Sequence, residues 1–352
     1  MAYTTIDDPS AHFQIKLYSG TGSSNSVTND GNSNMQPDFV WIKERNNAVS
    51  HRLFDSSRGV QKRIFSNVAD AESTQSNSLT AFDSDGFTLG DGGSVNGGSD
   101  TYVAWQWKAN GGSRTTFTES GDNPGGGYQA NTTAGFSIVD YVGTGATGTV
   151  QHGLGTVPKW MMFKNRDTAQ TWVVYHHRNT SAPETDILQL ESNNATYDGH
   201  TYFNDTGPTS SVFTVATSND LNKDGDNIIS YIWDEIQGFS RFGSYKGNGS
   251  TDGPIIYTGF RPAWIMIKRT NGAQNWPIFD TKLRPSNMVD NNFLYADLNN
   301  AVDTTNQFDI LSNGFKLNMS SNLTNGNGDT YVYMAFAEQP FVTSKGVPAN
   351  AR

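Results

Sequence analysis

One segment occurs three times in this 352-residue chain, and the repeat limits the fold more than any other feature. Each copy begins with a proline and continues as an apolar, strand-like run: PDFVWIKER at Pro37, PKWMMFKNR at Pro158 and PAWIMIKRT at Pro262. A lysine stands six residues after each proline, namely Lys43, Lys164 and Lys268. Self-similarity at a fixed spacing indicates that one structural unit is built more than once.

Other landmarks keep the same order around each proline. A Y-x-G-x-G motif precedes it, beginning at Tyr18, Tyr141 and Tyr245. Eighteen residues after it stand Asp55, His176 and Asp280. Later come Asp100, Asp226 and Asp329, each followed seven residues on by a large aromatic residue: Trp107, Trp233 and Phe336. The spacing predicts three matching units with these aspartates in matching places.

The residues between the landmarks favour strands and turns. Before each of the three aromatic residues, bulky residues alternate along the chain, as in Val103, Trp105 and Trp107, which is typical of a strand with one face toward a core. Glycine-rich turns separate the short strands, and no long amphipathic helical pattern is present. We therefore predict an all-β fold of three tandem antiparallel β-sandwich units, of jelly-roll or lectin-like type.

The landmarks also set the expected organisation. It comprises an N-terminal arm at 1–12, unit 1 at 13–112, a Gly/Thr/Asn-rich linker at 113–135, unit 2 at 136–236, and unit 3 with a C-terminal tail at 237–352. The long linker predicts that unit 1 is set apart, whereas the few residues between Trp233 and Phe239 predict that units 2 and 3 dock tightly. The repeated lysines are expected at strand exits facing solvent, and Trp172 and Trp276 in the core.

The N-terminal arm leaves two alternatives open. It is short, polar and interrupted by Pro9, so it cannot form a domain. It either pairs in extended form with a neighbouring subunit or another protein, or folds back onto unit 1 as an edge strand.

Composition excludes several classes of partner and site. The chain has 24 Lys and Arg against 34 Asp and Glu, a net charge of −10, so we expect neither nucleic acid nor an anionic membrane surface as partner. It has no cysteine, which excludes disulfides and cysteine zinc sites. The N-terminus MAYTTIDDPSAHFQ lacks the regions of a signal peptide, and no apolar run approaches the ~20 residues that span a bilayer. We expect a chain made in the cytoplasm, without membrane insertion and without a cofactor.

Histidines and carboxylates raise the question of catalysis. His176 and His177 lie near Glu184 and Asp186, but His176 takes the place of an aspartate in the other copies, and no G-x-S-x-G motif is near. His152 has no counterpart in the segment YTGFRP of the third copy. Both observations favour structural roles, so we predict that the chain is not an enzyme and has no catalytic residues.

One loop suggests a metal site. DLNKDGDN places Asp220, Asn222, Asp224 and Asp226 at alternate positions, as in a calcium loop of the EF-hand type. The twelfth position is Tyr231 instead of glutamate. A turn without metal is the main expectation, and calcium at these four residues is the alternative.

One long loop suggests a ligand. The segment ESNNATYDGHTYFNDTGPT holds Tyr197, His200 and Tyr202 among amide and carboxylate groups. Sugars offer apolar faces edged by hydroxyls, so this set is a candidate glycan site. The alternative is that the aromatic rings pack onto the sandwich beneath the loop.

The repeated motifs carry a resemblance. The segments GFSIVDYVGTGATGTVQHGLGTVPKWMMFKNRDTAQTWVVYHHR and GDTYVYMAFAEQPF are similar to a family of uncharacterised, tail-fibre-like bacteriophage virion proteins common in marine phages. The resemblance covers almost the whole chain and brings no catalytic residues. It implies a virion structural protein of β-sandwich units, assembled in the bacterial cytoplasm, with other virion proteins, copies of itself and a host surface glycan as partners.

Several functions fit this reading. The leading one is a tail-associated or fibre protein that contributes to host attachment. The alternatives are a capsid-decorating or head-fibre protein without a receptor role, and a capsule depolymerase, which would need two facing carboxylates. A secreted lectin is disfavoured by the N-terminus.

Overall fold

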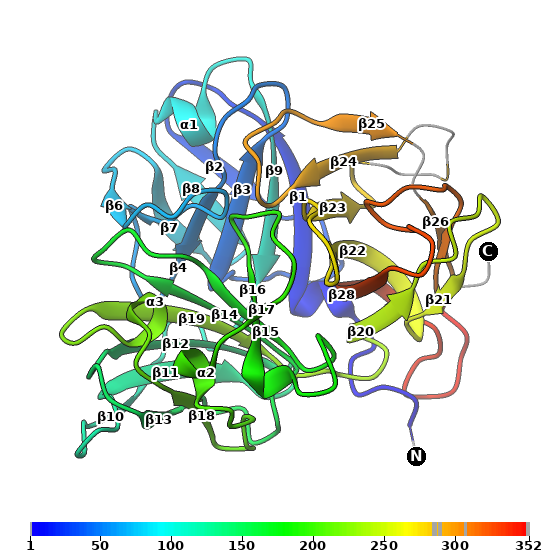
Figure 1. The fold of residues 1–352 in the computed structure, drawn as a ribbon. Coiled ribbons are helices and arrows are strands. Elements are labelled where there is room, and N and C mark those ends of the chain that lie inside the picture. Colours follow the sequence, from blue (N-terminus) through cyan, green and yellow to red (C-terminus); the bar gives the residue numbers. More distant parts are fainter. Residues whose placement is uncertain (1, 284–286, 288–290, 306–307, 350–352) are drawn as a thin grey trace.

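The structure is a computed structural model that describes residues 2–283, 287, 291–305 and 308–349 (Figure 1). Nearly all regular structure is antiparallel sheet, which confirms the all-β prediction. Three large sheets each have a small sheet beside them, and we call these the first, second and third sheet pairs. Within the described residues, no helix is long and apolar enough to cross a membrane.

The first sheet pair is blue and cyan in Figure 1. Its large sheet has the order β1-β9-β3-β4 and its small sheet the order β2-β8-β7, with the short β5-β6 ladder beside them. The bounds are β1 Phe13–Ser19, β2 Asn25–Thr28, β3 Phe39–Glu44, β4 Arg52–Asp55, β5 Lys62–Arg63, β6 Ser73–Thr74, β7 Leu79–Asp83, β8 Gly86–Leu89 and β9 Thr101–Trp107, with helix α1 at Gly93–Asn96.

The second sheet pair contains the largest sheet. The order is β10-β11-β12-β19-β14-β15-β16-β17, with β13-β18 as the small sheet. The bounds are β10 Thr115–Phe117, β11 Gly126–Asn131, β12 Phe136–Val142, β13 Gly148–Gln151, β14 Trp160–Asn165, β15 Val173–His176, β16 Asp186–Gln189, β17 Tyr197–Asp198, β18 Val212–Val215 and β19 Asn227–Trp233, with helices η2 Pro183–Thr185, α2 His200–Phe203 and α3 Asn219–Asn222.

The third sheet pair ends the chain and is yellow-green to red in Figure 1. Its large sheet has the order β20-β28-β22-β23-β24-β25 and its small sheet the order β21-β27-β26. The bounds are β20 Ser240–Lys246, β21 Ile255–Tyr257, β22 Phe260–Arg269, β23 Pro277–Asp280, β24 Asn291–Tyr295, β25 Asp303–Thr305, β26 Phe308–Leu311, β27 Gly314–Leu317 and β28 Thr330–Pro340.

The three large sheets share one pairing register. The last strand of each sheet pair (β9, β19 or β28) has two neighbours of the same kind in all three sheets. One is the strand that holds the tyrosine of the Y-x-G-x-G motif (β1, β12 or β20), and the other is the strand marked by the repeated proline (β3, β14 or β22). The aromatic landmark pairs with the residue two positions after that proline: Phe39 with Trp107, Trp160 with Trp233, and Trp264 with Phe336. Asp100, Asp226 and Asp329 each stand directly before the last strand. The sequence landmarks therefore mark the same place in each sheet.

One tryptophan-rich core joins all three sheet pairs. The indole rings of Trp107 and Trp233 lie 6.1 Å apart, and those of Trp107 and Trp264 lie 5.7 Å apart. This cluster holds buried residues from every large sheet, while a smaller core lies between the sheets of each pair. The prediction that unit 1 is set apart is therefore wrong, because the alternating face of β9 is buried in a core that it shares with the other two large sheets.

Residues 113–135 are not a loose linker. They contain β10 and β11, and β11 pairs along the whole of β12. The glycines suit this pairing, since a Cβ on Gly126 would stand 2.1 Å from the carbonyl oxygen of Asp140. Composition alone suggested a tether, whereas these glycines let two strands approach closely.

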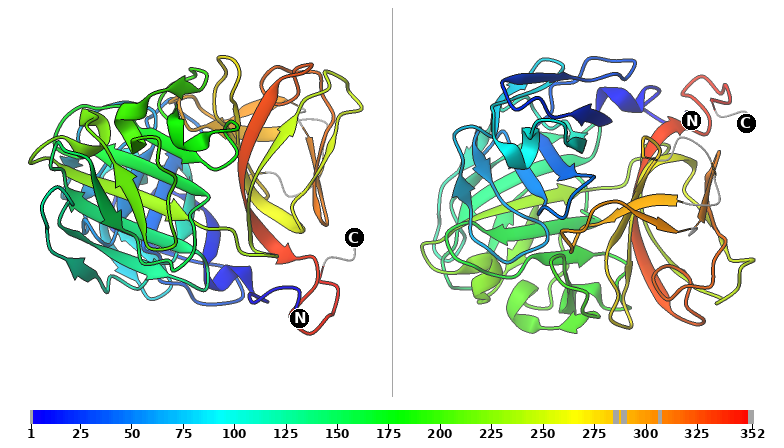
Figure 2. Two further views of the ribbon diagram at one scale, coloured as in Figure 1. Left: turned by 60° about the horizontal axis from the view of Figure 1, so that its bottom comes forward. Right: turned by 90° about the horizontal axis from the view of Figure 1, so that it is seen from above.

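The N-terminal segment folds back onto its own chain, but not onto the first sheet pair. The hydroxyl of Tyr3 donates to the carbonyl oxygen of Gly259 at 2.5 Å, and Ile6 is buried. A short helix, η1 at Pro9–Ala11, then leads into β1. The segment therefore lies against the third sheet pair, near the C-terminal residues (Figure 2). Ile6 packs in the shared hydrophobic core. It forms neither an extended arm nor an edge strand of unit 1.

The repeated lysines are buried. Lys43, Lys164 and Lys268 are all 0% exposed, so the expectation that they face solvent is wrong. The ammonium of Lys164 donates to the carbonyl oxygens of Ala69 and Gln170, at 2.7 and 2.5 Å. Burial lowers the pKa of each lysine to about 8. All three ammonium groups donate hydrogen bonds to backbone carbonyls. The sequence shows only a lysine at the end of an apolar run and does not predict this role.

Candidate functional site

The sites of interest lie where neighbouring sheet pairs meet, and polar side chains hold these interfaces together. The hydroxyl of Tyr231 in the second pair donates to the carboxylate of Asp55 in the first, at 2.7 Å. The indole N–H of Trp105 in the first pair donates to Asp280 in the third, at 2.9 Å. Tyr231 and Trp105 occupy corresponding positions, five residues after Asp226 and Asp100.

His176 completes this set at the second–third interface. The residue that corresponds to Tyr231 and Trp105 in the third pair is Met334, which has no hydrogen-bond donor. A buried carboxylate opposite Met334 would lack the donor that crosses the other two interfaces. The histidine instead donates from Nε2 to the carbonyl oxygen of Tyr333, at 3.4 Å. Burial holds the pKa of His176 well below its ordinary value. The presence of histidine at position 176, where the other copies have aspartate, therefore has a structural explanation.

A second set of side chains crosses the interfaces fourteen residues after each repeated proline. His51, Trp172 and Trp276 are all 0% exposed, which confirms the prediction that the two tryptophans are core residues. Their ring nitrogens donate to backbone carbonyls of the neighbouring sheet pair, at Tyr295, Phe65 and Gln189 in that order. Each sheet pair is thus tied to both neighbours.

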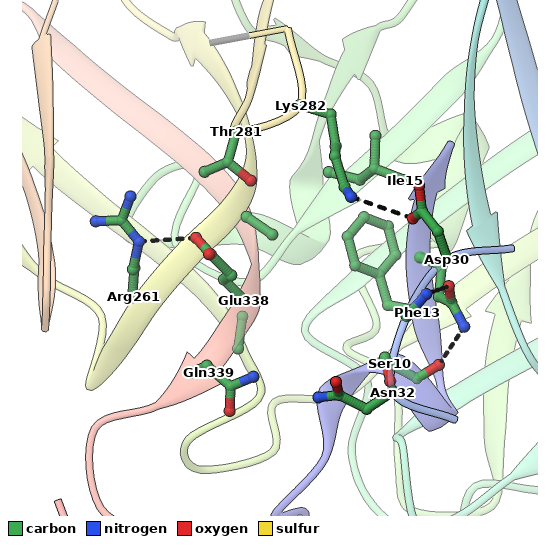
Figure 3. Close-up of a pocket in the computed structure, with 14 residues that line it drawn as sticks. Ser10, Phe13, Ile15, Asp30, Asn32, Arg261, Thr281, Lys282, Glu338 and Gln339 are labelled. Carbon is green, nitrogen blue, oxygen red and sulfur yellow. Dashed lines mark hydrogen bonds and ion pairs between the residues drawn. The ribbon is translucent and has the colours of Figure 1, made fainter. Parts of the chain in front are cut away.

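A cavity of about 350 Å³ opens at the third–first interface, beside the outer edge of β1 (Figure 3). Lys282 reaches across it to Asp30, with Nζ and Oδ1 3.1 Å apart. On the opposite wall, Arg261 Nε donates to Glu338 Oε2 at 2.7 Å. Both carboxylates of this cavity are therefore already paired with cations.

Two cavities meet at the second–third interface, beside the outer edge of β20. They have volumes of about 730 and 300 Å³, and Arg178, Ser244, Tyr245 and Lys246 line both. We call the two together the β20 groove. The larger cavity extends from polar residues of the second sheet pair across the adjoining ends of β20, β28 and β22, and the smaller one extends toward β21. In the part of the chain that the structure describes, the charged ends of Arg178 and Lys246 have no acidic partner.

The corresponding space at the first–second interface is occupied by β11. Gln129 of β11 is buried and donates from Nε2 to Ser56 Oγ and Ser57 Oγ, at 2.8 and 2.7 Å. Ser57 stands twenty residues after Pro37, where the other copies have Arg178 and Lys282. A strand of the chain itself therefore lies where the other two interfaces have a cavity.

A comparison with family models places the whole fold in one family. The model of a domain of unknown function, DUF7483, matches residues 8–340. The chain belongs to the DUF7483 family. No curated protein and no solved structure matches it.

The DUF7483 match spans all three sheet pairs as one domain, in agreement with their single shared core. The β20 groove lies inside the matched residues. The interfaces are thus internal to the domain.

The residues expected to bind a glycan are only partly accessible in this DUF7483 domain. Tyr197 is 56% exposed and His200 is exposed as well, but Tyr202 is buried. The hydroxyl of Tyr202 donates to Asp220, and its ring packs edge-on against Tyr197. They do not line any of the three cavities described above.

The structure does not bring the four calcium candidates together. Asn222 is buried and donates to the carbonyl oxygens of Ala146 and Ala216. Asp226 accepts from Asn165 and Thr168, and Asp224 is exposed. Among the described residues of this domain, no group of three His, Cys, Asp or Glu side chains could hold a metal ion.

The remaining histidine candidates also have structural partners. His177 Nε2 donates to the carbonyl oxygen of Phe242 at 2.7 Å, and His152 Nε2 donates to that of Thr209 at 3.2 Å. Asp186 accepts from the hydroxyl of Thr180. Burial lowers the pKa of both histidines, to about 4 for His177.

Sequence reasoning missed the residues of the β20 groove. Arg178 would have been found by extending the proline spacing to twenty residues, where Ser57 and Lys282 are its counterparts. Lys246 is the variable second residue of the Y-x-G-x-G motif, which reads Ser19 and Val142 in the other copies. The repeat therefore contained the signal, since Arg178 and Lys246 are cations at two positions where the first copy has serine.

Proposed function

We propose that this chain is a non-catalytic structural protein of a bacteriophage particle, located on the tail or a fibre and contributing to host attachment. The observation that carries the proposal is the single core of eight fully buried tryptophans, closed by three large sheets. Such a core makes a rigid body whose loops can vary without disturbing the strands, which suits a protein that must survive outside the cell. The resemblance of the repeated motifs to tail-fibre-like virion proteins supports the same proposal.

The test is to find the protein in purified particles of a phage that encodes it. Mass spectrometry of particles and labelling with an antibody against the chain should detect it at the tail. Labelling of the head alone would favour the capsid-decorating alternative. Its absence from purified particles would contradict both.

The attachment role has its own test. The purified protein should bind host cells and slow phage adsorption when added in excess. Incubation with host capsule checks for a depolymerase, because release of reducing ends would contradict a non-catalytic role.

A further inference from the structure

The outer edge of β20 presents unpaired backbone groups. In an antiparallel ladder, alternate residues direct their N–H and C=O groups to opposite sides of the strand. Gly247 donates its N–H to the carbonyl of Asp329, in register with the β20–β28 ladder, so the odd-numbered residues of β20 bond to β28. The even-numbered residues, among them Ser244 and Lys246, therefore point their backbone groups outward.

Only part of this edge is covered. At Phe242, the backbone N–H donates to Glu235 and the carbonyl accepts from His177. Beyond it, in the described part of the chain, no hydrogen bond joins the outward backbone groups of Ser244 or Lys246 to another residue. Both residues are exposed. An open edge of this kind is a template for another strand.

The molecule itself shows what such an edge accepts. The corresponding residues of β12 are Asp140 and Val142, and their outward groups face β11 in an antiparallel ladder. The N–H of Val142 donates to the carbonyl of Gly125 at 3.0 Å. β11 thus demonstrates strand addition at this position of the repeat, with the same pairing geometry available on β20.

The surroundings of the open edge define the chemistry of an added strand. Arg178 and Lys246 offer two cations without acidic partners in the described residues, in a chain of net charge −10. Next to them, Ile255 and Tyr257 of β21 are 64% and 55% exposed. Side chains of an extended strand alternate between two directions. A segment with alternating acidic and apolar residues would place both kinds of side chain against matching surface.

We propose that the β20 groove binds an extended acidic polypeptide segment by strand addition along Ser244–Lys246. The segment's backbone bonds to the outward groups of Ser244 and Lys246, and its carboxylates pair with Arg178 and Lys246. Main-chain bonds supply affinity in this mode, and side chains supply selectivity. The inference does not depend on the proposed virion role, because it concerns only the ligand of this groove.

The first experiment uses a fluorescein-labelled peptide, Glu-Val-Glu-Val-Glu-Val, capped at both ends, with fluorescence anisotropy on the full chain. Saturable binding is expected, with no binding of the Lys-Val-Lys-Val-Lys-Val control. Two N-methylated versions carry the methyl groups on the Glu or on the Val residues. One version should lose binding and the other should keep it, since only one set of amides faces β20. No binding of the parent peptide, or equal binding of the two methylated peptides, would overturn the proposal.

Protein variants test the same contact from the other side. Ser244→Pro removes an outward N–H without touching the β28 ladder and should weaken binding about fivefold or more, as expected for a lost backbone bond. Ser19→Pro removes an outward N–H at the end of β1, at the position that corresponds to Lys246, and should leave binding unchanged. Arg178→Glu should weaken binding about tenfold, whereas Lys345→Glu, an exposed site elsewhere with the same charge change, should not.

A competing ligand class gives a distinct result. Trigalacturonate supplies carboxylates without a peptide backbone. If it binds with the same sensitivity to Arg178→Glu while Ser244→Pro has no effect on either ligand, the groove recognises acidic glycans and strand addition is wrong. If Ser244→Pro does not fold, the two N-methylated peptides still decide the question on the unaltered protein.

Discussion

The first–second and second–third interfaces are built from corresponding residues, yet one is filled and the other is open. At the first, β11 lies along β12, and Gln129 fixes it to Ser56 and Ser57. At the second, the corresponding edge of β20 borders two cavities. One inserted strand accounts for the difference, so a repeat can keep its core and still produce a binding groove at one interface and a sealed contact at another.

The largest expected effect lies at the filled interface. Arg58 is fully buried, contacts Asp55, and donates to Glu72 and to the hydroxyl of Tyr231 across the interface, at 3.1 and 3.3 Å. Arg58→Met would leave Asp55 as an uncompensated buried charge, and we expect a loss of about 3–5 kcal/mol in the free energy of unfolding. Urea denaturation at pH 7 measures it.

The control for this change is at an open interface. Lys282 and Asp30 form an ion pair at 3.1 Å, but their side chains are 45% and 47% exposed. Lys282→Met should therefore cost less than about 1 kcal/mol. Equal losses for the two variants would contradict the distinction between filled and open interfaces.

The next effect depends on pH. Asp280 corresponds to Asp55, but among the described residues no arginine forms an ion pair with its carboxylate as Arg58 does with Asp55. Burial raises the pKa of Asp280 to about 6. The folded state then keeps a proton that the unfolded chain has released between about pH 4 and 6. The contribution of Asp280 to stability is therefore greatest at low pH and falls as pH rises through this window.

Asp280→Asn tests this assignment. The substitution removes the acceptor of the Trp105 indole N–H, which lowers the free energy of unfolding by the same amount at every pH. Because the variant has no carboxyl group at position 280, its stability should lack the pH dependence that Asp280 contributes. The free energy of unfolding of the native protein, minus that of the variant, should fall by about 2–3 kcal/mol from pH 4 to pH 7. The subtraction cancels the opposite trend of buried histidines such as His51, whose pKa is lowered by burial. A difference that stays constant with pH would refute the raised pKa.

An effect of similar size is expected from the strand that fills the interface. Gln129→Ala removes two hydrogen bonds to serines and one from the N–H of Gly112. At about 1 kcal/mol for each bond, the loss should be about 2–3 kcal/mol. Thermal unfolding measures it, and amide exchange should show faster opening of β11. Unchanged exchange in β11 would mean that the ladder with β12 alone holds this strand.

The repeat made much of the fold predictable and little of the site. Landmark spacing identified the strands and the core tryptophans, because a strand with one buried face must alternate. It did not show that three sheets close around one core, since an apolar face does not specify its partner. Residues 113–135 resembled a linker because glycine serves both flexible chains and close strand contacts. Lys164 is buried because carbonyl groups converge on it, which depends on turns formed by other segments. The unpaired state of Arg178 likewise depends on its neighbours in space.

The smallest expected effect is at the open edge. Arg178 and Lys246 have no ion-pair partner in the described part of the chain, so the double variant Arg178→Ala, Lys246→Ala should change the free energy of unfolding by less than about 0.5 kcal/mol. Amide exchange of the native protein makes the comparison residue by residue. The N–H of Val142, bonded to Gly125, should be protected, whereas the corresponding N–H of Lys246 should exchange as fast as in an unstructured peptide. Strong protection at Lys246 in the isolated monomer would mean that another part of the chain already covers this edge, and the groove would then have no room for an added strand.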